Sequence, residues 1–249
     1  MLSEILYFGR TGVAVDFALS HKLALAGADM GCVHCCGVLA LLTAGPLFIN
    51  DETDEATDSK HEAKAFELAT KSARANSCFG FLALFRFYGH GVHVDKNDEI
   101  AMRYLKIAAS QGYPQALVFL GESFRQGAGV KEDKLEAMRL FRLASDQGQD
   151  DAHRLLGIMF FEGDGVGCNK MEAARFLRLA ADDARAQTLL ARMLYNGDGL
   201  EPDKVEALRL YRLAADQDHA EAEFELGAKF LNGEIEKEPG QTARWFISF

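Results

Sequence analysis

The sequence AMRLFRLASDQG (Ala137 to Gly148), preceded by the loop GAGVKED (Gly127 to Asp133), decides the fold. Copies of both recur along the chain at a nearly fixed distance. The alanine that opens the copied stretch stands at Ala101, Ala137, Ala173, Ala207 and Ala243, with spacings of 36, 36, 34 and 36 residues. A fixed period in this range is typical of stacked helix–turn–helix units that bury their apolar faces against one another. The sequence therefore predicts a repeat protein.

Each unit contains a first helix, a Gly-x-Gly loop and a second helix. Gly127 and Gly129 are expected to end the first helix, because glycine adopts the left-handed conformation at little steric cost. Asp133 is expected to cap the second helix. Copies of this loop are GHGVHVD (Gly89 to Asp95), GDGVGCN (Gly163 to Asn169) and GDGLEPD (Gly197 to Asp203). Apolar residues at helical spacing predict the inward faces, namely Ala116, Leu120 and Phe124 in one helix and Ala137, Leu140, Phe141 and Ala144 in the next.

We expect one array over residues 1–249. Its units are a degraded first unit at 1–31, a unit at 32–75 with an acidic loop insertion at 46–60, regular units at 76–112, 113–148, 149–183 and 184–218, and a partial last unit at 219–249. The insertion, PLFINDETDEATDSK, has no apolar face, so helix is expected to resume at Glu62.

The composition is that of a folded soluble protein, with 49% hydrophobic and 26% charged residues. The formal net charge of −10 and the isoelectric point near 5.2 argue against a nucleic-acid or anionic-membrane partner. One stretch, Gly31 to Ile49, is nearly continuous apolar sequence and approaches the ~20 residues that a spanning helix needs. His34 and Gly45-Pro46 interrupt it, so a buried helix is favoured and a membrane segment is the open alternative.

The cysteines are five in number, and three of them, Cys32, Cys35 and Cys36, are crowded into one segment. An odd, clustered set is not a disulfide framework and favours a reducing compartment, so we expect a cytoplasmic location. The spacing Cys-Val-His-Cys-Cys is compatible with zinc ligands, but a structural zinc site normally needs four ligands and no second pair follows. We therefore expect buried thiols along a helix, with no metal and no cofactor.

The repeated pattern, Ala-x3-Leu-Gly-x2-aromatic-x2-Gly-x-Gly-Val-x2-Asp-x3-Ala-x6-Ala-Ala-x-Gln-Gly, resembles the Sel1-like repeat, a relative of the tetratricopeptide repeat. The matching residues are Ala116, Leu120, Gly121, Phe124, Gly127, Gly129, Val130, Asp133, Ala137, Ala144, Gln147 and Gly148. The resemblance implies an all-α, right-handed α/α superhelical solenoid of about six repeats, with a concave groove. Departures from the pattern are Arg86 in the place of Phe124, Ala191 in the place of Gly121, and a linker after Asp183 that is two residues short.

The tetratricopeptide analogy places certain first-helix residues in the groove, as the partner-binding surface. They are Leu84, Phe87, Val118, Glu122, Arg125, Arg154, Ile158, Phe161, Thr188, Arg192, Tyr195, Phe224, Ala228 and Leu231. Arginines, aromatics and aliphatics dominate binding hot spots, so this mixture favours an interaction surface. The same mixture also suits the edge of a poorly covered core, and that alternative stays open.

A ladder of basic residues recurs in the second helices. One position carries Arg103, Arg139, Arg175 and Arg209, and the position three residues on carries Lys106, Arg142, Arg178 and Arg212. Glu136, Glu172 and Glu206 precede an arginine by three residues, which predicts local ion pairs on a solvated face. The alternative is a docking stripe for an acidic partner.

The function that the resemblance implies is a non-catalytic scaffold or adaptor that binds a protein or peptide in the groove. We expect a monomer or weak self-association, and charge reversal at Arg154 and Arg192 should abolish capture without altering melting. The alternative is a regulatory repeat segment of a larger enzyme or signalling protein, which the apolar end at Trp245 to Phe249 suggests. A hydrolase or zinc enzyme is the remote alternative, because no nucleophile elbow or complete ligand set is present.

Overall fold

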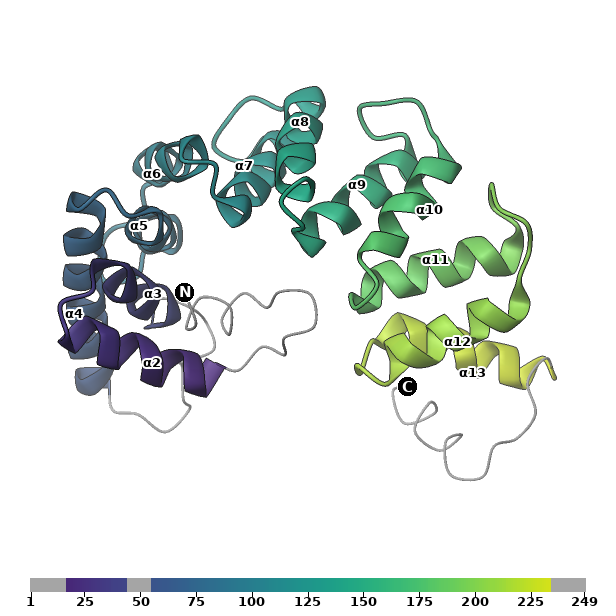
Figure 1. Cartoon of the computed structure of the whole chain (residues 1–249), viewed down its shortest axis with the longest axis horizontal. Coiled ribbons are helices and arrows are strands. Elements are labelled where there is room, and N and C mark those ends of the chain that lie inside the picture. Colours follow the sequence, from purple (N-terminus) through teal and green to yellow (C-terminus); the bar gives the residue numbers. More distant parts are fainter. Residues whose placement is uncertain (1–16, 44–54, 234–249) are drawn as a thin grey trace. The chain divides into compact units, whose positions relative to one another are not determined.

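The computed structural model describes residues 17–43 and 55–233, and within them every regular element is an α-helix (Figure 1). The helices are α2 (Phe17–Asp29), α3 (Val33–Thr43), α4 (Glu55–Arg74), α5 (Cys78–His90), α6 (Asp98–Ser110), α7 (Pro114–Gln126), α8 (Lys134–Ser145), α9 (Asp150–Glu162), α10 (Lys170–Leu179), α11 (Ala184–Asn196), α12 (Lys204–Ala215) and α13 (Ala220–Leu231). They follow the predicted alternation of first and second helices. The fold is an all-α solenoid of helical repeats.

The chain divides into two compact units, Met1–Gln149 and Asp150–Phe249. In the first unit α3 packs against α2, α4 and α5, and the pairs α5–α6 and α7–α8 follow (Figure 1). In the second unit α9 pairs with α10, α11 with α12, and α12 with α13. The predicted single array over 1–249 stays a prediction.

The predicted inward faces form the core, except that Phe124 of α7 is only half-buried. Ala137, Phe141 and Ala144 of α8 are fully buried, and Leu140 is 4% exposed. The ring of Phe141 lies over Gly121 of α7, where an added Cβ atom would come within 2.6 Å of its Cε1 atom. The glycine of the Leu-Gly pair is thus a packing residue, since its missing side chain makes room for the aromatic ring of the second helix.

The loop residues perform the predicted capping. The side chains of Asp133, Asn169 and Asp203 each accept a hydrogen bond from the backbone N–H three residues on, at 3.0, 3.1 and 2.9 Å. In the unit at 76–112 the capping residue is Asn97, at 3.0 Å from Ile100 N. There the loop copy predicted at Gly89 to Asp95 was wrong by two residues.

The reason for that error is a histidine in a position usually held by glycine. The left-handed residues of this loop are Gly91 (φ 71°) and His93 (φ 60°), which correspond to Gly127 (φ 70°) and Gly129 (φ 69°). Gly89 belongs to α5. Counting from Gly91 keeps the period of 36, and Tyr88, not Arg86, then stands in the place of Phe124.

The glutamine of the Gln-Gly motif joins successive repeats. Gln111 Nε2 donates to the backbone oxygen of Asn76 at 3.1 Å, and Gln147 Nε2 donates to that of Gly112, also at 3.1 Å. Each bond spans 35 residues and links the end of one second helix to the same place in the preceding repeat. The motif residue therefore holds neighbouring repeats in register.

The helix after the insertion begins earlier than predicted. α4 starts at Glu55, not at Glu62, so the last part of the predicted loop at 46–60 is helical. The sequence EATDSKHEAKAFELA is rich in good helix formers, and a helix that is already nucleated extends at little cost. The predictions for residues 1–16, 44–54 and 234–249 lie outside the described residues.

Candidate functional site

Leu84 and Phe87, the first two residues predicted for the binding surface, belong to the core. They are 3% and 0% exposed, so the prediction that they lie on the groove surface was wrong. The two-residue register error is the cause. With the period of 36, the residues of α5 that correspond to Glu122 and Arg125 are Arg86 and Gly89.

The predicted residues of α7 divide between core and surface. Val118 is 2% exposed and packs in the core, so the prediction that it lies on the groove surface was also wrong. Glu122 and Arg125 are half-buried. Beside them the rings of Phe85 and Phe119 lie 5.9 Å apart. The sequence reasoning did not include these two half-buried phenylalanines.

In the second unit, the predicted residues of α9 join that helix to the first helix of the next repeat. Arg154 Nη2 donates to Asp151 Oδ1 at 3.0 Å, and its Nε atom lies 3.2 Å from Oδ2 of Asp183, the residue that caps α11. The guanidinium of Arg192 on α11 lies 5.9 Å from the ring centroid of Phe161. Ile158, between these contacts, is half-buried.

The predicted residues of α11 join that helix to α13 in the same way. Thr188 Oγ1 lies 3.0 Å from Nδ1 of His219, the residue that precedes α13. Arg192 Nη1 donates to Glu221 Oε1 at 3.1 Å. The amine of Lys229 lies 4.1 Å from the centroid of the Tyr195 ring. On α9 and α11, the predicted binding positions therefore hold successive first helices together.

Lys229 makes several contacts between α11, α12 and α13, and the sequence did not indicate them. Its side chain is 11% exposed, it pairs with Glu225 Oε2 at 2.9 Å, and it lies 5.4 Å from the ring centroid of Tyr211. Burial raises the pKa of the Tyr211 phenol. The i, i+4 spacing of Glu225 and Lys229 was readable in the sequence, but it does not indicate that the lysine also covers two tyrosine rings.

On α13 the same positions are exposed. Phe224 is 54% and Leu231 71% exposed, and Ala228 between them is half-buried. The spacing i, i+4, i+7 places the three residues on one face of the helix. We name Phe224, Ala228 and Leu231 the α13 stripe. It is the part of the predicted surface that presents large apolar side chains to solvent.

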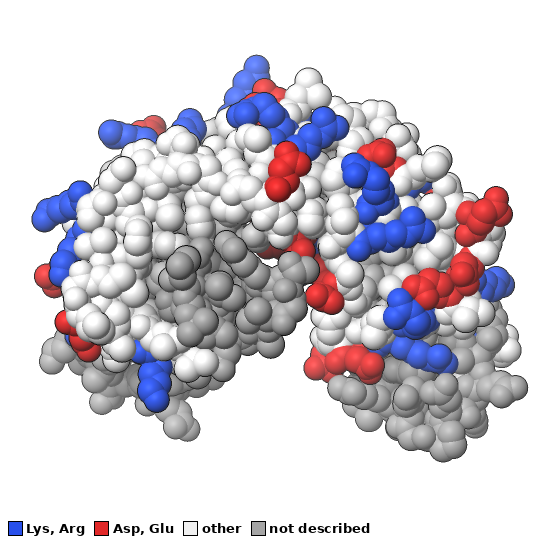
Figure 2. Space-filling view, viewed as in Figure 1, with Lys and Arg blue, Asp and Glu red and all other residues white. Residues whose placement is uncertain are grey.

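The basic ladder lies on the solvent side of the second helices. Arg139, Arg175 and Arg209 pair with Glu136, Glu172 and Glu206 at 2.6, 2.9 and 2.7 Å, as predicted, and the three arginine side chains are 58–59% exposed. The Arg139 hydrogen bond lowers the pKa of Glu136, and the Arg209 hydrogen bond lowers that of Glu206. Figure 2 shows basic and acidic side chains interspersed on the visible face. The contacts fit a solvated face.

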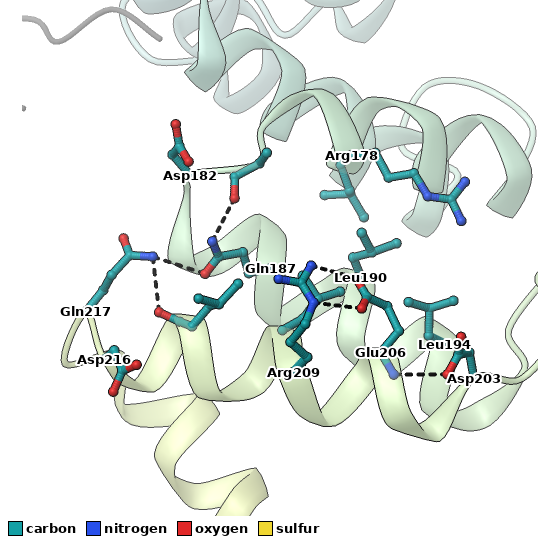
Figure 3. A pocket seen from close by; sticks show the side chains of 14 residues that line it. Arg178, Asp182, Gln187, Leu190, Leu194, Asp203, Glu206, Arg209, Asp216 and Gln217 are labelled. Carbon is teal, nitrogen blue, oxygen red and sulfur yellow. Dashed lines mark hydrogen bonds and ion pairs between the residues drawn. The ribbon is translucent and has the colours of Figure 1, made fainter. Parts of the chain in front are cut away.

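A cavity of about 850 Å³ lies among α10, α11 and α12. Its apolar lining comprises Leu177, Leu190, Leu194, Leu210 and Leu213. Asp182, Asp216 and Gln217 lie toward one end and Arg178 and Asp203 toward the other (Figure 3). α10 has 10 residues where α8 and α12 have 12, and the linker that follows is short. The α11 residues that line the cavity, Gln187, Leu190 and Leu194, are buried, at 5%, 5% and 6% exposure.

The cysteine cluster lies at the start of α3. Cys32 and Cys35 are half-buried and Cys36 is buried, all as free thiols. His34 Nδ1 lies 2.8 Å from Ser77 Oγ. Among residues 17–43 and 55–233, no group of His, Cys, Asp and Glu has the arrangement of a metal site. Over the same ranges, no helix has the length and apolar character to cross a membrane, and α3 itself has 11 residues.

Comparisons with known proteins agree with the geometry. The Sel1 repeat family model matches seven segments, at residues 1–32, 60–77, 81–113, 114–149, 150–183, 184–219 and 220–248. A search of curated proteins found no match.

Solved structures of repeat proteins are similar to this chain. A Sel1 repeat protein from Oxalobacter formigenes has a TM-score of 0.71 and 27% identity, over 89% of this chain and 96% of that one. A protective antigen of uropathogenic Escherichia coli with the same repeat fold has a TM-score of 0.71 and 24% identity, over 99% of this chain and 51% of its own. The chain thus spans about half of that antigen. An immunity protein from Pseudomonas aeruginosa has a TM-score of 0.56 and 21% identity, over 89% and 84% of the two chains.

Proposed function

The chain belongs to the Sel1 repeat family, whose members are generally protein-interaction scaffolds, and we propose that it is a non-catalytic scaffold that binds an amphipathic helix of a protein partner on the α13 stripe. The observation that carries the proposal is the exposure of Phe224 and Leu231, at 54% and 71%. Large apolar side chains grouped on one exposed helix face mark interaction sites more often than isolated ones do.

The repeat pattern indicates what kind of partner fits. Arg154 and Thr188 occupy the position of Phe224 in the two preceding repeats, and each contacts the residue that caps or precedes the next first helix. Arg192 occupies the position of Ala228 and contacts α13 directly. The α13 stripe therefore lies where this architecture packs another helix. A partner helix can use the same place.

The dimensions of the stripe favour a helix with apolar residues at i, i+3 or i+4, and i+7. Phe224 and Leu231 are separated by about 10 Å along the axis, two helical turns. The small side chain of Ala228 lets another backbone come close between them. At one end Glu221 pairs with Arg192 and is 54% exposed, so its carboxylate can accept a second bond from a basic residue of the partner. Binding modes of this type depend on a few apolar anchors of the docked helix.

The test replaces the stripe and compares a matched pair of exposed apolar residues elsewhere. Phe224→Asp with Leu231→Asp should abolish partner capture. Met171→Asp with Val205→Asp, at positions 72% and 82% exposed on second helices, should leave it intact. Circular dichroism and melting check that both double variants fold.

A photo-crosslinking residue at position 231 identifies what is bound. The proposal expects a cross-linked partner peptide with apolar residues at helical spacing. Capture that survives the stripe variant, or that both double variants lose equally, contradicts the proposal. Cross-links to a second copy of this chain, together with a change from monomer to dimer mass as the protein concentration rises, would show that the stripe mediates self-association and not partner binding.

A further inference from the structure

We propose that Cys32 and Cys35 form a redox-active dithiol that reduces an accessible disulfide, with Cys32 as the attacking thiol and Cys35 as the resolving thiol. The site lies at the first turn of α3. It is independent of the α13 stripe and of partner binding there.

Backbone geometry places Cys32 at the capping position of α3. Its carbonyl oxygen accepts the N–H of Cys36 at 3.0 Å, and its sulfur accepts the N–H of Cys35 at 3.4 Å. A capping side chain normally uses an oxygen for this bond, as Asp133 does in α8. Here the thiol takes that place, so the sulfur lies at the positive end of the helix dipole.

The spacing brings the second thiol to the first. Residues three apart are neighbours on a helix surface, so Cys35 stands beside Cys32 on the first turn. The hydrogen bond from the Cys35 side chain lowers the pKa of Cys32, and burial together with that bond raises the pKa of Cys35 to about 11. Cysteines in Cys-x-x-Cys pairs at helix N-termini commonly divide in this way into a reactive thiolate and a protonated partner.

Gly27 of α2 holds Cys35 in this position. An added Cβ atom at Gly27 would clash with the Cys35 sulfur, so the absence of a side chain there makes room for the thiol. The Gly27 carbonyl also accepts the N–H of Cys32 at 2.9 Å. One residue of α2 thus contacts both cysteines of the pair. His34, which lies between them in sequence, is engaged with Ser77.

The reaction balances with a disulfide as the sole co-reactant. The Cys32 thiolate attacks one sulfur of the substrate disulfide, forms a mixed disulfide and releases the first substrate thiolate, which takes up a proton. The Cys35 thiol then loses its proton and attacks the Cys32 sulfur, which releases the second substrate thiol. The protein dithiol is oxidised to a disulfide and the substrate is reduced to two thiols.

The first experiment uses the full chain and oxidised glutathione, with mass spectrometry of proteolytic peptides. The wild type should lose two hydrogen atoms from the Cys32–Cys35 peptide and release two glutathione molecules. Cys35→Ser should stop at a stable glutathione adduct on Cys32. In that variant the serine hydroxyl replaces the Cys35 thiol as the hydrogen-bond donor to Cys32. Cys32 should therefore still react about tenfold faster than exposed Cys168, a lone thiol that serves as the internal control.

Cys32→Ser supplies a variant whose fold is preserved, because serine caps a helix well. It should reduce glutathione modification at Cys35 to the rate of Cys168 or below. A parallel reaction with insulin distinguishes a protein disulfide from a small one as the substrate. Two results would overturn the proposal. One is equal reaction rates at Cys32 and Cys168 in Cys35→Ser, and the other is wild-type protein that keeps glutathione on Cys32 without forming the internal disulfide.

Discussion

Replacing Arg154 by methionine should destabilise the protein far more than the same change at Arg139, although both arginines make ion pairs three residues away. Burial is the difference between them. The Arg154 side chain is 12% exposed and lies between Asp151 and Asp183, which are 41% and 25% exposed. Arg139 is 59% exposed and pairs with Glu136. Methionine keeps most of the apolar stem in each case, so the comparison isolates the charged group.

The magnitude follows from the two partners of Arg154. The bond to Asp151, which is more than a third exposed, contributes roughly 0.5 kcal/mol, as exposed pairs do. The contact with Asp183 is more enclosed, and its loss leaves a shielded carboxylate beside α11, at a cost of about 1.5 kcal/mol. Arg154→Met should therefore lower the free energy of unfolding by about 2 kcal/mol. Arg139→Met should lower it by about 0.5 kcal/mol or less.

Urea unfolding measures both variants, and a double-mutant cycle tests the cause. Asp183→Asn removes the charge but keeps the cap on α11, because asparagine caps as well as aspartate. The cycle of Arg154→Met with Asp183→Asn should give a coupling of about 1 kcal/mol. Equal losses at Arg154 and Arg139, or a coupling near zero, would refute the reasoning. The result also bears on Arg154→Glu, which should lower the melting temperature and so cannot serve as a clean test of partner binding.

Three further variants test the packing, the repeat junction and the surface pairs. Gly121→Ala should lower the free energy of unfolding in urea by about 1 kcal/mol, because the clash with Phe141 outweighs the gain in helix propensity. Ala191→Gly, at the matching site of α11, should lower it by about 1 kcal/mol through helix propensity alone. Gln147→Ala should cost about 0.5 kcal/mol and raise the hydrogen exchange rate at the end of α8, with Gln126→Ala as the exposed control. Glu136→Gln should lower stability at neutral pH but not in acid. The Arg139 bond holds the pKa of Glu136 in the folded state below its ordinary 4.5, so the stability that the wild type gains is present above pH 4.5 and is lost as the pH falls through the folded-state pKa. Unfolding at a series of pH values measures this difference.

The repeat period predicted the helices because the contact between a first and a second helix, which each repeat must make, determines both the period and the packing. Ala137, Phe141 and Ala144 recur in register since each second helix needs the same contact with a first helix, and all three are fully buried. The caps were equally predictable, because an aspartate or asparagine before a helix has a local chemical role that needs no knowledge of the rest of the fold.

The loop motif gave the wrong register in one repeat, because a residue other than glycine, His93, adopts the left-handed backbone conformation there. Gly89-His90-Gly91 has the form of the loop signature, yet the left-handed residues are Gly91 and His93. The distance to Ala101 contained the correction. Gly127 precedes Ala137 by 10 residues, and Gly91, not Gly89, precedes Ala101 by the same 10 residues. The period was the stronger evidence, and the motif shifted Leu84 and Phe87 onto a surface that they do not reach.

The binding surface was the hardest feature to predict, for a physical reason. A position that holds the next repeat and a position that holds a partner both need arginines, aromatics and aliphatics at the same spacing. Arg192 and Tyr195 have those properties because α13 covers them, through Glu221 and Lys229. Phe224 and Leu231 belong to the same residue types and are 54% and 71% exposed. The residue types of a repeat therefore indicate that a helix packs on this face, and they do not indicate whether that helix comes from the same array or from a partner.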